Sequence, residues 1–264
     1  MTTQVRRAPL AGVTVARIGN PFWTPQQLDG EGNVYNQVLA VTSHIGGALN
    51  SLEFVNIPPA ENGVASSVGE HEQGTDEIYF VVEGTGILTT NGIPHKVSPG
   101  FLAIAPRGTK HSICNLSMQD WLRFLVMELK TPDELVTHQP AHIEGLLSAM
   151  QESDAFHPAE VGQQSIPLEV ASVDLSGYFA SPFGLLRVVR IPVGARVGPY
   201  QEPDHDENLL SVEGFAQVRL GADLCITSGH ERLNVFVPRE VTRMIVNPSS
   251  KDPLTILSLL VRHV

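Results

Sequence analysis

The sequence has few cysteines, few basic residues and no long apolar run. Its only cysteines, Cys114 and Cys225, lie far apart, so a disulfide framework is excluded and a reducing cytoplasm is the simpler prediction. No stretch of about 18 apolar residues occurs, so we expect no membrane span. No apolar segment follows the two arginines near the N-terminus, so we expect no secretory signal.

Basic residues are outnumbered by acidic ones. The chain has 17 Lys and Arg against 28 Asp and Glu, a net charge of −11 with histidine neutral. Such a field repels polyanions, so we expect neither a nucleic-acid partner nor an anionic membrane surface. Apolar residues make up 42% of the 264 residues, which is enough to form the core of one large domain or two ordinary ones.

Short β-strand patterns separated by turn residues dominate the chain. Residues 34–41, 52–57 and 77–82 are rich in β-branched and aromatic side chains, and Asn91-Gly92 is typical of a tight hairpin turn. No amphipathic helix interrupts this first run of strands. The pattern therefore predicts antiparallel sheets rather than βαβ units.

A different pattern follows in residues 131–157. Thr131 to Glu134 read as a helix start, with a capping hydroxyl, a proline and two acids. Beyond Pro140, the four apolar residues Ile143, Leu146, Leu147 and Met150 have the spacing of one helix face. This segment is therefore predicted to be a helical connector.

The second half of the chain repeats the first. Residues 76–84 and 206–214 both begin Asp-Glu and end Glu-Gly, at an offset of 206 − 76 = 130. Residues 106–115 and 238–247 both begin Pro-Arg and end in Asn, at an offset of 238 − 106 = 132. Two motifs at nearly one offset indicate a duplicated domain, and closing each half into a barrel or jelly roll would remove exposed strand edges.

Two segments of the first half resemble the signature motifs of the cupin superfamily. The first motif departs from the family at its second histidine, where this chain has Gln73, and in the spacing of its upstream glycine. The second motif matches at every position. The matching residues are His71, Glu77 and Gly84 in the first motif and Gly100, Pro106, Gly108, His111 and Asn115 in the second. The resemblance covers residues 35–130 well and 175–264 more weakly, so the chain looks like a bicupin.

The resemblance implies an all-β fold of two tandem antiparallel jelly-roll (cupin) barrels joined by the short helical connector. Residues 1–33 would form an N-terminal arm, 34–130 the first barrel with the metal site, 131–157 the connector, and 158–264 a degenerate, metal-free barrel. The arm, with its Pro21-Phe22-Trp23, would lie across a neighbouring barrel or pack on its own second domain. We expect a homodimer.

Strand parity predicts where the motif side chains point. His71, Gln73 and Glu77 share parity and would face one barrel, with His111 opposite them. Two imidazoles and one carboxylate form a 2-His-1-carboxylate set, which predicts one divalent metal ion per chain, with Fe first and Zn, Mn, Ni or Co as alternatives. Without a metal, Glu77 would be a buried unpaired charge or would take up a proton. The alternative is a satisfied polar cluster in a vestigial barrel.

Gln73 is the informative departure from the family pattern. A neutral amide oxygen is a weaker ligand than imidazole, so Gln73 would either bind the metal weakly or hydrogen-bond substrate or water. Tyr79 continues the inward row and is a candidate proton donor, with packing as the alternative. Arg123 would either face the barrel and pair with a substrate carboxylate, or point outward. Cys114 is expected to be packed in the core, facing away from the metal.

The second half has lost the metal ligands. The offsets map His71 to Gln201, Glu77 to the retained Glu207, and His111 to Arg243. Arginine is always protonated and cannot bind a cation, so we hypothesise an Arg243–Glu207 ion pair in place of the metal. The run from Asp204 to Glu207 is interpreted as a solvated loop.

These observations predict a metal-dependent enzyme that acts on a small-molecule substrate in the first barrel. The residue set favours a non-haem iron dioxygenase, with Tyr79 and Gln73 as candidate catalytic residues. One alternative is a redox-neutral isomerase or cyclase that uses Zn, Ni or Mn as a Lewis acid. Another is a non-catalytic bicupin that binds a ligand.

Overall fold

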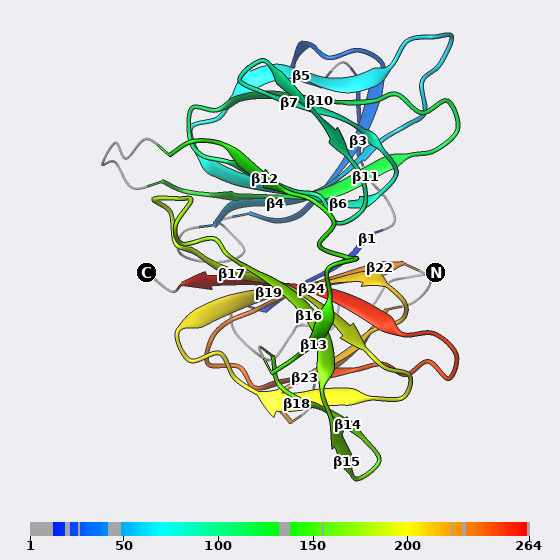
Figure 1. Ribbon diagram of the computed structural model, residues 1–264, viewed down its shortest axis with the longest axis vertical. Coiled ribbons are helices and arrows are strands. Elements are labelled where there is room, and N and C mark those ends of the chain that lie inside the picture. The colour runs from blue at the N-terminus through cyan, green and yellow to red at the C-terminus, as the bar shows by residue number, and fades with distance from the viewer. Residues whose placement is uncertain are drawn as a thin grey trace.

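The computed structural model describes residues 13–18, 22–25, 27–41, 49–131, 138–154, 156–222, 224–228 and 231–262. It is almost entirely β: the described residues contain one short 3-10 turn, η1 (Gln27–Asp29), and otherwise antiparallel strands. Two barrels lie one above the other, the first at the top of Figure 1 and the second below it. None of the described residues belongs to a helix with the length and apolar character needed to cross a membrane.

The first barrel closes a seven-stranded sheet over a four-stranded one, in the orders β12-β9-β6-β11-β4-β3-β2 and β5-β10-β7-β8. The predicted Asn91-Gly92 hairpin joins β7 to β8, and both residues have positive φ, 48° and 79°. The strands are β2 (Phe22–Pro25), β3 (Asn33–Val41), β4 (Leu49–Ile57), β5 (Ser66–Glu72), β6 (Asp76–Glu83), β7 (Gly86–Thr90), β8 (Ile93–Val97), β9 (Leu102–Ala105), β10 (Lys110–Asn115), β11 (Leu122–Leu129) and β12 (Ala141–Ile143).

The second barrel pairs a seven-stranded sheet, β1-β22-β19-β24-β17-β16-β13, with a six-stranded sheet, β15-β14-β18-β23-β20-β21. Its strands are β1 (Thr14–Ile18), β13 (Gln151–Ser153), β14 (Ala159–Val161), β15 (Gln164–Ile166), β16 (Leu168–Asp174), β17 (Phe183–Ile191), β18 (Arg196–Tyr200), β19 (His205–Glu213), β20 (Gln217–Leu220), β21 (Leu224–Thr227), β22 (Arg232–Val237), β23 (Arg243–Val246) and β24 (Leu254–Arg262).

The two seven-stranded sheets pack back to back, and this explains why their strands are apolar on both faces. On β6, Tyr79 and Val81 belong to the core inside the first barrel, whereas Ile78 and Phe80 belong to a core between the barrels. The core between the barrels also contains residues of the second half, such as Phe183. A separate core fills the second barrel. The continuous apolar pattern of residues 77–82 thus reflects two buried faces.

The duplication seen in the sequence extends to individual hydrogen bonds. Asn115 and Asn247 occupy the same place in the two barrels, and each side-chain amide donates to three backbone carbonyls. The acceptors are Ile57, Pro58 and Asp120 for Asn115, at 2.8–3.0 Å, and Ile191, Pro192 and Asp252 for Asn247, at 3.0–3.1 Å. The last asparagine of the repeated motif therefore fastens the same loop in each barrel.

The predicted helical connector is wrong for its described part. Residues 138–154, 156 and 157 contain the strands β12 and β13, which extend β9 and β16, and a turn rather than a helix. Leu146 is buried in the core between the barrels, so that core, rather than a helix face, explains its apolar character. Gly145, at φ 69°, takes a left-handed conformation that interrupts a helix. The expected helix start falls largely on 132–137, outside the described residues.

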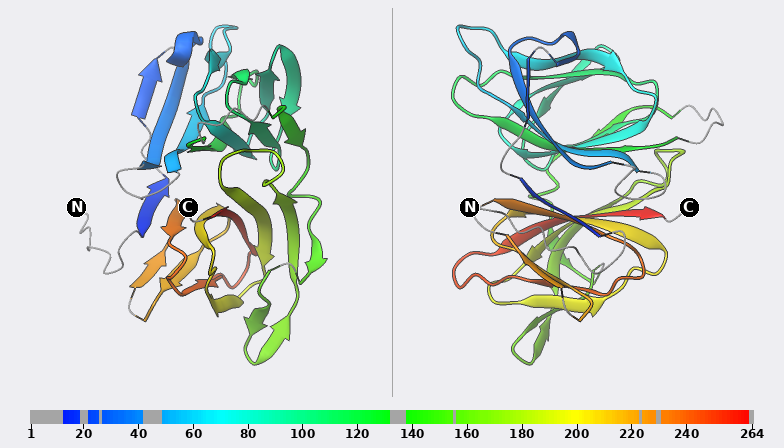
Figure 2. Two further views of the ribbon diagram at one scale, coloured as in Figure 1. Left: turned by 90° about the vertical axis from the view of Figure 1, so that its left-hand side faces the viewer. Right: turned by 180° about the vertical axis from the view of Figure 1, so that it is seen from behind.

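The described part of the N-terminal arm packs on both barrels of its own chain: β2 pairs with β3 of the first barrel, and β1 joins the second. β1 pairs with β22, with Val15 opposite Val235, and adds an edge strand to the large sheet. The blue β1 lies at the level where the two barrels meet, and the green connector runs along one side of both barrels (Figure 2). Of the two expected positions, the structure has the intramolecular one for residues 14–18.

Candidate functional site

Two predicted ligands, His71 and His111, lie side by side inside the first barrel. They are directly opposite each other as Cα partners in the ladder between β5 and β10. Their ring centroids are 4.2 Å apart, with 64° between the ring planes. The two signature motifs, far apart in the sequence, therefore place their histidines next to each other.

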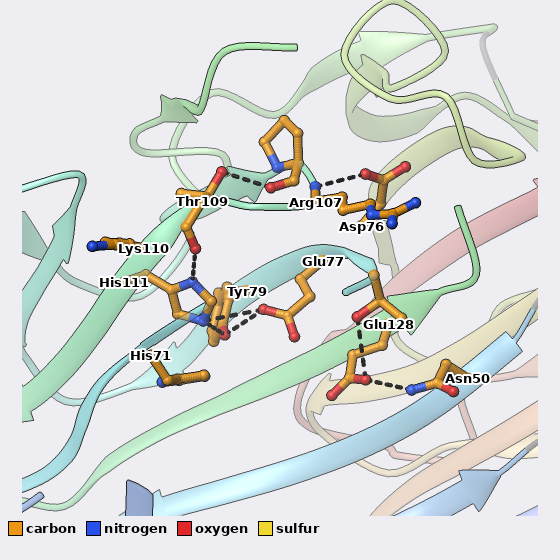
Figure 3. Close-up of polar contacts among 12 residues, drawn as sticks. Asn50, His71, Asp76, Glu77, Tyr79, Arg107, Thr109, Lys110, His111 and Glu128 are labelled. Carbon is orange, nitrogen blue, oxygen red and sulfur yellow. Dashed lines mark hydrogen bonds and ion pairs between the residues drawn. The ribbon is translucent and has the colours of Figure 1, made fainter. Parts of the chain in front are cut away.

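Both imidazoles are oriented in the same way. The Nδ1 atom of His71 lies 2.9 Å from the carbonyl oxygen of Gly69, and Nδ1 of His111 lies 2.9 Å from that of Thr109. Figure 3 shows the second of these bonds. Since a carbonyl oxygen only accepts, each Nδ1 carries a proton, and Nε2 is the nitrogen through which each ring, when neutral, could bind a metal. This is the arrangement that metal-binding histidines usually show.

Glu77 completes the group from β6. Its Oε2 atom lies 3.2 Å from Nε2 of His111, and both residues are almost fully buried. The other oxygen, Oε1, is buried with no hydrogen-bond partner among the described residues. Burial opposes the charged form of His111, but the hydrogen bond and charge of Glu77 outweigh it and raise the pKa of His111. For His71, burial lowers the pKa, so its neutral form is favoured.

Tyr79 lies between Glu77 and His111. Its hydroxyl donates to Oε2 of Glu77 at 2.8 Å and lies 2.7 Å from Nε2 of His111 (Figure 3). Burial and the neighbouring Glu77 carboxylate raise the Tyr79 pKa well above its usual value, so the phenol keeps its proton. Within the described ranges, no three His, Cys, Asp or Glu side chains are already arranged to hold a metal ion. The donors share one cavity, but the Tyr79 hydroxyl contacts Nε2 of His111, the nitrogen that a metal would use.

Gln73 lines the same cavity, although it lies one residue beyond the end of β5. Strand parity therefore does not explain its placement. Its backbone carbonyl accepts a hydrogen bond from the amide of Gly108, at 3.1 Å. Because Gly108 belongs to the second motif, this bond fastens the two motifs together beside the cavity.

The cavity is small, about 50 Å³, and it contains two acids that the sequence analysis missed. Glu53 on β4 and Glu128 on β11 line it together with Glu77. Strand parity predicts that both acids point inward, because Glu53 is in phase with the inward Val55 and Glu128 with the inward Val126. Burial, followed by the charges of Glu77 and Glu53, raises the pKa of Glu128, against hydrogen bonds that lower it.

Two further candidates lie away from the cavity. Arg123 points outward and pairs with Glu83, at 2.6 Å between Nη1 and Oε1. Glu83 also binds Arg232 of the second barrel at 3.1 Å, so Arg123 belongs to a contact between the barrels. Cys114 is only half-buried, and burial raises the pKa of its thiol.

The hypothesised ion pair of the second barrel is confirmed. Nε of Arg243 lies 2.6 Å from Oε2 of Glu207, and both side chains are fully buried. The expected solvated loop is wrong for residues 205–207, because β19 begins at His205 and carries Glu207 into the core.

One position in the mapping of the second barrel was also wrong. The residue opposite Arg243 is Tyr200, not Gln201, because an irregularity in the ladder between β18 and β23 shifts the register. The Tyr200 hydroxyl donates to Oε2 of Glu207 at 3.1 Å, whereas Gln201 is exposed and hydrogen-bonds Thr242. Tyr200 and Arg243 thus stand where the first barrel has its two histidines.

Comparisons with known proteins agree with this architecture. Residues 54–128 match the family model described as "Cupin domain". No curated protein sequence matches the chain significantly. The similar solved structures include a putative glyoxylate-induced protein from Pseudomonas aeruginosa, at 18% identity and a TM-score of 0.67, covering 100% of this chain and 95% of that one.

Two other solved structures have the same fold at lower identity. A mutant of Bacillus subtilis oxalate decarboxylase OxdC is 13% identical, with a TM-score of 0.63, covering 95% of this chain and 77% of that one. Vicilin from hazelnut, Corylus avellana, is 12% identical, with a TM-score of 0.66, covering 94% and 86%. Identities this low show the fold alone, so the chemistry has to be argued from the residues of the site. Residues 54–128 of the first barrel therefore match a cupin domain, and the chain as a whole has the two-barrel fold of these solved structures.

Proposed function

We propose that the first barrel binds a divalent metal ion and that the protein is a metal-dependent enzyme acting on a small organic molecule. The proposed ligands are His71, Glu77 and His111, with Gln73 as a fourth, weaker ligand. The observation that carries this proposal is the cross-strand pair of histidines beside a carboxylate with an unpartnered buried oxygen. A bound divalent ion would supply Lewis-acid chemistry at a substrate oxygen or, as iron, redox chemistry with O₂.

The chain's own residues supply proton handling. The Tyr79 phenol holds a proton 2.8 Å from a Glu77 oxygen, and its raised pKa keeps that proton in place at neutral pH. Glu128, with its raised pKa, is a second group able to exchange a proton in the same cavity. Gln73 adds a neutral amide that orients substrate or water.

These groups favour redox-neutral chemistry, a lyase or isomerase reaction in which protons move. The solved oxalate decarboxylase of Bacillus subtilis, described with Mn(II) centres, has the same fold at 14% identity and a TM-score of 0.61. A non-haem iron dioxygenase is the second candidate, because His71, His111 and Glu77 are the residue types of the 2-His-1-carboxylate set.

Anaerobic reconstitution of untagged protein with Fe, Mn, Zn, Ni or Co, followed by elemental analysis, tests metal binding. We expect stoichiometric uptake by the wild type and loss of uptake in His111→Ala and Glu77→Gln. His95→Ala is the matched control, because His95 lies on β8 outside the cavity. Absence of uptake by the wild type for every ion would overturn the proposal in favour of a metal-free ligand-binding protein.

Oxygen consumption separates the two reaction classes. The Fe(II)-loaded protein is screened with small organic molecules in an oxygen electrode. Substrate-dependent O₂ uptake supports the dioxygenase. Turnover of a substrate under anaerobic conditions, with Mn or Zn bound, supports the redox-neutral enzyme.

A further inference from the structure

The cavity of the first barrel is lined by carboxylates and by no basic side chain of lysine or arginine type, as far as the structure describes the chain. Its acids are Glu53, Glu77 and Glu128. They come from three adjacent strands, β4, β6 and β11, of the large sheet. The acids therefore form a row on the inner face of one sheet, opposite the two histidines.

The ladder places these acids close together. Glu128 is the direct Cα partner of Glu77, and Val126, two residues before Glu128, is the partner of Glu53. Directly opposite side chains on one face of an antiparallel pair lie about 5 Å apart, and like charges there repel. A row of this kind is destabilising unless cations or hydrogen-bond donors balance it.

Neutral amides hold Glu53 and Glu128 in position. Asn50 donates to Oε2 of Glu128 at 2.7 Å, and Asn36 donates to Oε2 of Glu53. Neither amide removes the negative charge. Glu53 and Glu128 are half-buried, whereas Glu77 is fully buried, and its Oε1 atom has no hydrogen-bond partner in the described part of the chain. The unpartnered atom marks the deep end of the cavity as a ligand position, and the two half-buried acids lie nearer its mouth.

On this basis we propose that the substrate carries an ammonium group, which Glu53 and Glu128 bind, and that it is not a simple carboxylate. The inference rests on the metal-dependent function proposed above and names its substrate class. A divalent ion contributes two positive charges against three carboxylates, so the cavity has no surplus positive charge to balance an anion. A cationic nitrogen would neutralise the remaining negative charge of the cavity and donate hydrogen bonds to Glu53 and Glu128. The small volume admits a head group of a few atoms.

A matched pair of probes tests the substrate class. 2-Aminoethanol and glycolate share a hydroxyl-bearing carbon and differ in their charged ends. Their dissociation constants for the Mn(II)-loaded full chain are measured by calorimetry, after the metal content of each sample has been determined. We expect protonated 2-aminoethanol to bind at least about tenfold more tightly than glycolate.

Variants assign the effect to the two acids. Glu53→Gln and Glu128→Gln should each weaken 2-aminoethanol binding by about tenfold while the metal content stays the same. The matched control is Glu70→Gln, which removes an exposed acid on β5 outside the cavity and should change neither constant. Thermal melting of each variant confirms that it is folded.

The possible failures are distinguishable. Equal or tighter binding of glycolate, no binding of 2-aminoethanol, or unchanged binding in both Gln variants would overturn this inference while stoichiometric Mn(II) upholds the metal site. A wild type that takes up no metal would instead overturn the proposed function.

Discussion

Nε of Arg243 lies 2.6 Å from Oε2 of Glu207 in the sealed interior of the second barrel. Arg243 holds the ladder position that His111 holds in the first barrel, and Glu207 corresponds to Glu77. A permanent guanidinium cation therefore stands beside Glu207, the counterpart of the acid that is proposed to bind a metal in the first barrel. Burial raises the Glu207 pKa, but the charge of Arg243 and a hydrogen bond from Ser258 oppose this shift.

Removing one partner of this pair should destabilise the second barrel strongly. Glu207→Gln leaves the Arg243 cation buried without a counter-charge, and such changes cost about 3–5 kcal/mol in the free energy of unfolding. Urea unfolding followed by circular dichroism measures the loss. Glu160→Gln is the control, since it breaks the exposed pair with Arg196 and should cost under about 1 kcal/mol. Similar costs for the two variants would contradict a special role for the buried pair.

The second barrel should bind a metal ion once histidines replace Tyr200 and Arg243. The double substitution Tyr200→His and Arg243→His puts two imidazoles opposite each other on β18 and β23, beside Glu207. Elemental analysis after reconstitution should then give about one more metal ion per chain than in the wild type. Glu207→Gln added to the double variant should remove the gain. An unchanged metal content in a folded double variant would show that more than these side chains has been lost.

Tyr79 should compete with the metal in the first barrel. Its hydroxyl lies 2.7 Å from Nε2 of His111, and this contact must break when that nitrogen binds a metal. Tyr79→Phe should therefore tighten metal binding by up to about tenfold, the value of about one hydrogen bond. Competition against a metal-chelating dye measures the change, with Tyr178→Phe, in the contact between the barrels, as control. Weaker metal binding in Tyr79→Phe would mean that the hydroxyl supports the site instead.

The two repeated asparagines should be equivalent in stability. Asn115→Ala and Asn247→Ala each remove a buried amide that donates to three carbonyls, so each should cost about 2–3 kcal/mol. Chemical denaturation of the two variants in parallel gives the comparison. A large cost in one barrel and none in the other would contradict the structural equivalence of the repeated loops.

Local rules predicted much of this protein. The alternation of faces along a strand is a property of the backbone, so it explains why Glu77 and Tyr79 of β6 face one interior. His71 lies on β5, in the other sheet, so the motif resemblance rather than parity accounts for its correct placement. The repeat, with its retained Glu207 and its Arg243, predicted the ion pair of the second barrel. Parity along β4 and β11 likewise places Glu53 and Glu128 inward, in phase with Val55 and Val126.

Register and long-range packing were decided only by the tertiary structure. A ladder irregularity replaced Gln201 with Tyr200 opposite Arg243, and no offset in the sequence records such a shift. The helical spacing around Leu146 came from burial between the barrels, and Arg123 found its partner Glu83 on a neighbouring strand. The sequence alone determined the all-β repeat and the side chains that face its interior, because these follow from local periodicity. Which side chains meet depended on cross-strand pairing and on contact between the sheets, which join residues far apart in the chain.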